Sequence, residues 1–140
     1  MRSEREIKFR GKVPKEYQEN FFKGGFVYGS YLGDSDDTDD TVGTIINDKF
    51  EAEILTETLG QFTGMYDING KEIYEDDIVR GCMYNGSYCD GVIEYIKNSF
   101  EAVPIPRFSE GNSDDFKSME VVGNIYENPE LLWAKLLYQE

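Results

Sequence analysis

The residues best suited to do chemistry are four carboxylates within six positions, Glu72, Glu75, Asp76 and Asp77. Acids that converge on a divalent cation are the ligands of many metal-dependent hydrolases. The same residues fit turn chemistry, because they flank tight turns in which Asp is favoured. A nuclease would also need a basic surface to hold its substrate. We therefore interpret these acids as turn residues, and a metal-dependent hydrolase that uses this cluster stays as an alternative.

A second acidic segment, residues 34–40, carries five carboxylates in seven residues. A calcium loop of the EF-hand type needs Gly at position six and Glu at position twelve. A loop that starts at Asp34 has Asp39 and Ile45 at these positions, and one that starts at Asp40 runs through the apolar residues 41–46. No register fits. We expect a solvated polar loop and no metal site.

Two cysteines, Cys82 and Cys89, are spaced too widely for a zinc knuckle and have no further ligands nearby. If Asn85-Gly86 forms a two-residue turn, the cysteines face each other across a hairpin, with Cα atoms about 5.5 Å apart. A disulfide is then geometrically feasible, although an intracellular protein keeps such thiols reduced. We expect free thiols, with a disulfide or redox switch as the alternative.

The composition excludes several classes of enzyme. The 140 residues include no His, which removes Ser-His-Asp and Cys-His catalysis. The sequence also has no glycine-rich phosphate loop, dinucleotide fingerprint or nucleophile elbow. It therefore offers no catalytic, cofactor-binding or metal-ligating set. We expect a protein that is not an enzyme and needs no cofactor.

The charge of the chain is large and uneven. Residues 1–30 hold seven basic and four acidic residues (net +3), and the remainder holds seven basic and twenty-four acidic residues (net −17). This asymmetry favours a basic arm that contacts the acidic remainder of the same fold or of a second copy. Nucleic acids and anionic membranes would be repelled. The alternative is an acidic surface that imitates DNA phosphates and inhibits a host DNA-binding protein.

The chain has the length of about one domain, and its aromatic content of 14% is typical of a folded protein. No apolar run approaches the ~18 residues of a membrane span, and the N-terminus lacks a hydrophobic signal core. We expect a cytoplasmic protein.

Strands and tight turns dominate the pattern. Alternation over residues 6–13 predicts a half-buried strand with Ile7, Phe9 and Val13 facing the core and Arg10 facing solvent. Asn69-Gly70 predicts a type I′ hairpin turn, in which both central residues have positive φ. Further strands are expected at residues 26–32, 41–46, 50–55, 59–66, 71–74, 78–80, 92–96, 100–103 and 120–126, with a turn at Asn47-Asp48.

The end of the chain predicts a short amphipathic helix. Asn128 is a favoured N-cap and Pro129 suits the first helical position. One helical face is apolar and consists of Leu132, Trp133, Leu136 and Leu137. Many short strands and one terminal helix indicate a small, curved antiparallel barrel or sheet.

Three blocks together resemble the YopX-like proteins of bacteriophages and prophages. Residues 5–12 read Arg-Glu-Ile-Lys-Phe-Arg-Gly-Lys, residues 61–79 contain Asp-Ile-Asn-Gly-Lys-Glu-Ile-Tyr-Glu-Asp-Asp-Ile-Val, and residues 121–132 contain Gly-Asn-Ile-Tyr-Glu-Asn-Pro-Glu-Leu-Leu. The family usually has Gly at the position of Asp76, which indicates a positive φ that Asp tolerates.

The resemblance implies a mainly β fold with an SH3-like barrel in its C-terminal half. A single YopX-like domain would span residues 1–140, with an N-terminal β-rich part (1–58) and a barrel-like part with the C-terminal helix (59–140). The role it implies is that of a phage or prophage accessory protein of unknown biochemical function, with no catalytic residues to transfer. Because the shared blocks consist of turns, caps and core residues, we expect a protein-interaction or self-assembly module, with a homo-oligomer among the options.

Overall fold

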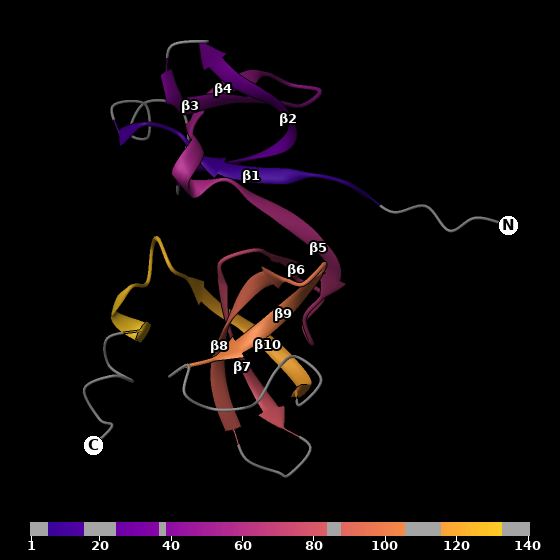
Figure 1. Ribbon diagram of the computed structural model, residues 1–140. Coiled ribbons are helices and arrows are strands. Elements are labelled where there is room, and N and C mark those ends of the chain that lie inside the picture. The colour runs from indigo at the N-terminus through magenta and orange to yellow at the C-terminus, as the bar shows by residue number, and fades with distance from the viewer. Residues whose placement is uncertain (1–5, 16–24, 37–38, 84–87, 106–115, 133–140) are drawn as a thin grey trace, which may run out of the picture. The chain divides into compact units, whose positions relative to one another are not determined.

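The computed structural model describes residues 6–15, 25–36, 39–83, 88–105 and 116–132 (Figure 1). The chain forms two compact units, residues 1–64 and residues 65–140, and we describe each by itself. Within the described ranges, ten strands form two antiparallel sheets, with the strand orders β4-β3-β2-β1-β5-β6 and β10-β7-β8-β9. The mainly β class expected from the sequence is confirmed.

The first unit contains the first five strands and one turn of 3₁₀ helix. Its elements are β1 (Phe9–Lys12), β2 (Phe26–Asp36), β3 (Asp39–Ile46), β4 (Glu51–Leu55), η1 (Thr56–Thr58) and β5 (Gly60–Tyr66), the last of which continues into the second unit. β1 pairs with both β2 and β5, so that Phe9 lies opposite Gly29 on one side and Gln61 on the other.

The core of the first unit is small and aliphatic. Its fully buried members are Val13, Val27, Ile45, Ala52 and Ile54. Gly11 of β1 lies against this core, because a Cβ added there would stand 2.9 Å from the Ile54 Cβ. The absence of a side chain at Gly11 therefore allows the backbone of β1 to approach β4 closely.

The alternation predicted around β1 is wrong at two positions. Ile7 was expected in the core but is 65% exposed, because the strand begins only at Phe9. Arg10 was expected to face solvent but is 5% exposed, and its guanidinium lies 4.6 Å from the centre of the Phe26 ring. The attraction between the Phe26 ring and the guanidinium offsets part of the cost of covering this cation.

The acidic segment at residues 34–40, which we expected to be a loop, is strand at residues 34–36 and 39–40, and residues 37–38 lie outside the described residues. β2 continues to Asp36 and β3 begins at Asp39, and these two residues are paired. The ladder bonds join backbone groups, so acidic side chains do not prevent strand pairing. The predicted turn at Asn47 is confirmed, since its Oδ1 accepts the N–H groups of Lys49 and Phe50 at 2.8 and 3.1 Å.

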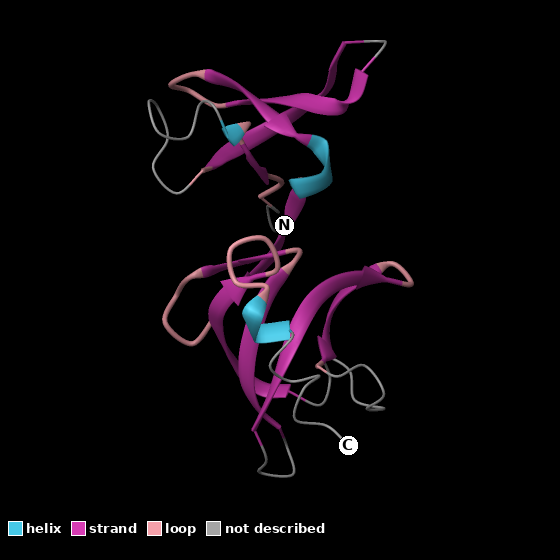
Figure 2. Cartoon of the chain, turned by 90° about the vertical axis from the view of Figure 1, so that its left-hand side faces the viewer, coloured by secondary structure: helices cyan, strands magenta, loops and turns pink. Residues whose placement is uncertain are grey.

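The second unit contains the remaining five strands. They are β6 (Glu72–Tyr74), β7 (Asp77–Met83), β8 (Tyr88–Ile96), β9 (Ser99–Pro104) and β10 (Phe116–Asn124). Strands β7 to β10 form a curved sheet (Figure 2). The buried core of the second unit consists of Ile73, Val79, Ile93 and Ala102. Within the described residues this sheet does not close into a barrel, and the SH3-like barrel stays a prediction.

Two turns of this unit differ from the sequence prediction. Asn69 does not have positive φ, and only Gly70 (φ 82°) does. Asp67 instead pairs with Lys71 across a three-residue loop, with the Asp67 N–H donating to the Lys71 carbonyl at 2.8 Å. A type I turn followed by a left-handed residue is the usual geometry of such a loop. Positive φ at two successive central residues occurs instead between β8 and β9, at Lys97 (48°) and Asn98 (71°).

The C-terminal helix is described only at its start, residues 130–132. The Asn128 carbonyl accepts the Leu131 N–H at 3.1 Å, whereas its side-chain Oδ1 accepts the Asn124 N–H at 3.2 Å. The predicted side-chain N-cap is therefore wrong, because Asn128 uses that oxygen for the preceding turn. The expected apolar residues Trp133, Leu136 and Leu137 lie outside the described residues. Within the described chain, no helix has the length and apolar content needed to cross a membrane.

Candidate functional site

The four carboxylates proposed as a metal site do not converge. Asp77 is 2% exposed and its Oδ2 accepts the Tyr74 N–H at 2.7 Å, while the Tyr74 hydroxyl donates to Glu72 at 3.1 Å. No three acidic or cysteine residues of the described chain are grouped so that they could hold a metal ion. The hydrolase alternative, which needed Glu72, Glu75, Asp76 and Asp77 around one cation, therefore loses its site.

Asp76 has the left-handed backbone conformation that we expected, because the family usually has Gly at this position. Its φ is 70°, its N–H donates to the Ile93 carbonyl at 2.8 Å, and its own carbonyl accepts the Ile125 N–H at 3.0 Å. The Asp76 carboxylate accepts the Tyr126 hydroxyl at 2.7 Å. This turn therefore joins β8 to the segment that follows β10.

Asp67 performs a similar structural role at the β5–β6 loop. Its Oδ1 accepts the N–H groups of Asn69 and Lys71 at 2.8 and 2.9 Å, and its Oδ2 accepts the Val121 N–H at 2.9 Å. Burial of the carboxylate acts to raise the pKa of Asp67, but these hydrogen bonds and the Lys71 charge outweigh it and lower the pKa below its usual value. The ionised side chain thus holds the loop against β10.

The Gly123–Asn128 segment is a third closed turn. The Asn124 Oδ1 accepts the N–H groups of Tyr126 and Glu127 at 3.0 and 2.9 Å. A Cβ at Gly123 would stand 2.4 Å from the Asn128 Oδ1, so only Gly leaves room for the Asn128 amide. The polar side chains described in this and the two preceding turns therefore stabilise the turns themselves.

The cysteines do not form the predicted pair. Cys89 lies opposite Gly81, and Cys82 lies opposite Tyr88, so the register differs by one residue from that of a two-residue turn. Cys89 is not part of a disulfide, and its thiol donates to the Asp90 carbonyl at 3.2 Å. The turn itself, residues 84–87, lies outside the described residues.

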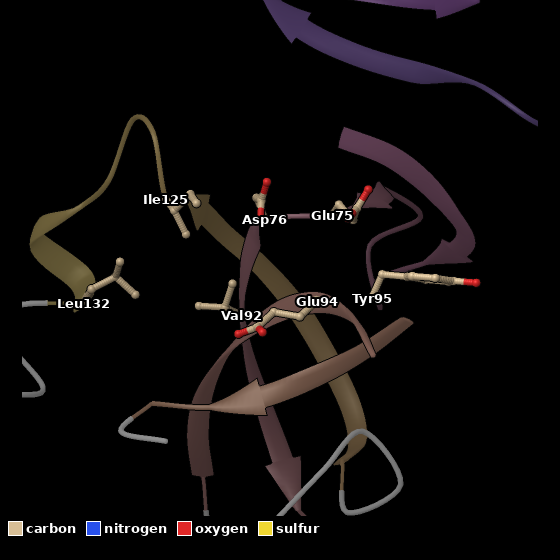
Figure 3. A pocket seen from close by; sticks show the side chains of 7 residues that line it. All are labelled: Glu75, Asp76, Val92, Glu94, Tyr95, Ile125 and Leu132. Carbon is tan, nitrogen blue, oxygen red and sulfur yellow. The ribbon is translucent and has the colours of Figure 1, made fainter. Parts of the chain in front are cut away.

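One open pocket on the second unit combines acidic, aliphatic and aromatic side chains. It has a volume of about 440 Å³ and lies between β8, the turn before β7 and the segment after β10. Figure 3 shows three aliphatic side chains at one end, carboxylates in the middle and a tyrosine at the other end. The lining residues are Glu75, Asp76, Val92, Glu94, Tyr95, Ile125 and Leu132.

The pocket presents two kinds of surface. Val92, Ile125 and Leu132 are half-buried and provide an apolar wall, whereas the Tyr95 ring is 55% exposed and lies 4.9 Å from the Phe100 ring. All charged members of the lining are acidic. Such a pocket can accept an aliphatic side chain beside a cation, because the wall offers apolar area and the carboxylates offer charge.

Sequence reasoning found only part of this site. It named Glu75 and Asp76, but as turn or metal residues, and it placed Leu132 on the apolar face of the helix. Glu94 and Tyr95 were read only as members of a strand. The lining comes from three segments between residues 75 and 132, so no local spacing could have predicted it.

The fold and site define a small β protein whose described residues form two antiparallel sheets. Polar side chains such as those of Asp67 and Asp76 stabilise its turns. The chain matches the YopX protein family over residues 8–133 and belongs to that family. A similar solved structure is protein EF1440 from Enterococcus faecalis, with 21% identity, a TM-score of 0.52 and coverage of 92% of this chain and 99% of that one. This likeness shows the fold. The search of curated proteins gave no match.

Proposed function

We propose that this protein is a small phage-type accessory protein that acts through protein contacts, as an interaction or self-assembly module without catalysis. The pocket of the second unit is its binding surface. The observation that carries this proposal is the lining itself, an apolar wall next to carboxylates and an exposed tyrosine.

The distribution of polar groups supports this assignment. Asp67, Asp77 and Asn124 accept backbone N–H groups, and Asp76 accepts a tyrosine hydroxyl. Acid–base and metal chemistry use side chains of these types. Their use in turns favours a scaffold that presents a surface over a site that transforms a substrate.

The pocket suits a protein ligand better than a small anion or a nucleic acid. Phosphate groups would face Glu75 and Glu94, and the net charge of −14 adds long-range repulsion. A peptide segment that carries a cation beside an aliphatic residue would be attracted and would also bury apolar area. Tyrosine is enriched at the centres of such interfaces.

The test compares two tyrosines of similar exposure in one binding experiment. Tyr95 lines the pocket and is 55% exposed, and Tyr66 is 56% exposed and does not line it. Wild type, Tyr95→Ser and Tyr66→Ser are immobilised at equal density and exposed to bacterial lysate and to the soluble chain. We expect capture by wild type and Tyr66→Ser and several-fold less by Tyr95→Ser. Equal capture by all three proteins, or none by wild type, would contradict the proposal.

A further inference from the structure

The pocket of the second unit has the start of the C-terminal helix in its wall. Leu132 lines the pocket together with Val92 and Ile125, and all three side chains are half-buried (Figure 3). The Leu132 N–H donates to the Pro129 carbonyl at 3.0 Å, so the first turn of the helix is formed here. The chain therefore continues from the edge of the pocket into residues 133–140, which lie outside the described residues.

Hydrogen bonds hold this first turn in place. The Asn128 Oδ1 accepts the Asn124 N–H at 3.2 Å and closes the turn that leads into the helix. The Ile125 N–H donates to the Asp76 carbonyl at 3.0 Å, which attaches the same segment to the turn before β7. Both Ile125 and Asp76 line the pocket, so the helix begins at a defined place beside it.

The residues that follow are complementary to the pocket. Residues 133–137 read Trp-Ala-Lys-Leu-Leu, with one cation and no acid. In a helix that continues from Leu132, Leu136 lies one turn further along the same face, with Trp133 beside it. The segment therefore offers apolar side chains next to Lys135, and the pocket offers an apolar wall next to carboxylates.

A helix of this length needs a surface on which to dock. Isolated helices shorter than about 12 residues are marginal in water, and tertiary packing of an apolar face supplies most of their stability. Covalent attachment at Leu132 gives the segment a high effective concentration at the pocket, an advantage that a separate chain does not have. The favoured occupant of the apolar wall is therefore the C-terminal segment of the same copy.

We propose that residues 133–137 fold back as a helix onto the pocket of their own copy and compete with its protein ligand. Leu136 packs on the apolar wall, and Lys135 faces Glu94. The contact is autoinhibitory, because the apparent affinity for a ligand falls with the fraction of molecules whose pocket is open. The regulatory part of this inference rests on the proposed function, whereas the docking of the helix does not.

The fluorescence of Trp133 tests the docking, because Trp133 is the only tryptophan of the chain. Val92→Ser removes part of the wall. Val122→Ser is the matched control, since Val122 is also half-buried in the second unit but does not line the pocket. We expect Val92→Ser to shift the emission to longer wavelength and to raise acrylamide quenching several-fold, whereas Val122→Ser stays close to wild type. Equal effects of the two substitutions, or emission that changes when wild type is diluted, overturn docking within one copy.

A second pair of variants leaves the sheet unchanged, so it tests the docking even if Val92→Ser does not fold. Leu136→Asp places a charge on the docking face of the helix, and Ala134→Asp places the same charge on the opposite face. Leu136→Asp should expose Trp133 to quenching and Ala134→Asp should not. Circular dichroism shows whether each variant is folded. Equal quenching of these two variants overturns the docking.

The capture experiment with bacterial lysate then tests the regulation. Leu136→Asp should capture several-fold more protein than wild type and Ala134→Asp, and Tyr95→Ser in the Leu136→Asp background should remove the gain. Equal capture by Leu136→Asp and Ala134→Asp overturns the autoinhibition. Failure of the docking remains distinct from failure of the proposed function, because the fluorescence of Trp133 needs no ligand and capture that depends on Tyr95 needs no docked helix.

Discussion

The carboxylate of Asp67 accepts the backbone N–H of Val121 at 2.9 Å, across 54 positions of the sequence. A backbone bond lies beside it, from the Ile68 N–H to the Met119 carbonyl at 3.0 Å. Together they fix the β5–β6 loop on β10. Asp67 is 8% exposed, so its carboxylate is covered even though Asn69 and Lys71 are exposed residues. The loop depends on one side chain.

Replacement of Asp67 with Ala should lower the free energy of unfolding by about 1–3 kcal/mol, because three backbone N–H groups lose their hydrogen bonds to a charged acceptor. Asp48→Ala is the control, since Asp48 is exposed and its substitution should have little effect. Urea unfolding followed by circular dichroism measures both. Equal midpoints for the two variants would show that water replaces the carboxylate.

The lowered pKa of Asp67 also predicts a pH dependence. Because the folded pKa lies below the usual value of 3.8, the ionised group stabilises the fold fully above 3.8. This contribution is lost as the pH falls through the lower, folded pKa. Asp67→Asn cannot ionise, so its stability should fall less than that of wild type between about pH 6 and pH 3. Parallel acid profiles for the two proteins would refute this.

The left-handed turn at Asp76 predicts a difference in stability between two substitutions that shorten its side chain. Asp76→Gly and Asp76→Ala both lose the hydrogen bond from Tyr126, so their comparison isolates the backbone. At φ 70° Ala is strained and Gly is not, and the Gly variant should be more stable by about 1 kcal/mol. Thermal melting of the two variants measures this difference. A more stable Ala variant would mean that the turn changes its conformation on substitution.

The sequence predicted those parts of the fold that depend on neighbouring residues. Strand periodicity identified most strands, and the Gly that the family usually has at the position of Asp76 predicted its positive φ. The Asn69-Gly70 signal correctly indicated a hairpin but not its loop length. That length depends on Asp67, whose carboxylate bonds to Asn69, Lys71 and the distant Val121. A local sequence pattern cannot indicate the hydrogen bond to Val121, which is 54 positions away.

The pocket could not be predicted for the same reason. Val92 and Ile125 are separated by 33 positions and meet only through the pairing of β7 with β8 and β10. The burial of Arg10 has a similar cause, since it depends on Phe26 from the neighbouring strand. Alternation assigns a face to a residue, but the neighbouring strand decides whether that face is covered.

The contact between Gly123 and Asn128 predicts a steric effect. Gly123→Ala should cost about 1–3 kcal/mol, because the new Cβ would stand 2.4 Å from the Asn128 Oδ1 and the turn must shift. The same substitution should cost less in an Asn128→Ala background, where the obstructing amide is absent. Chemical unfolding of the four proteins of this cycle gives the coupling. Equal costs in both backgrounds would show that another contact limits the site.

The last prediction concerns the ion pair between β7 and β8. Arg80 donates through Nε and Nη2 to the two carboxylate oxygens of Asp90, at 2.9 and 3.3 Å. Hydrogen bonding to Asp90 and its charge raise the pKa of Arg80. The Arg80 side chain is 52% exposed and that of Asp90 only 5%, so loss of Arg80 leaves a covered carboxylate without its cation.

Arg80→Ala should therefore cost about 1 kcal/mol, near the upper end of the range for exposed pairs. Arg80→Lys keeps the charge but loses the two-pronged geometry, and should recover only part of this stability. Urea unfolding in low and high salt separates the two contributions, because salt screens the charge attraction and affects the hydrogen-bond geometry little. Full recovery with Lys would show that charge alone stabilises the pair.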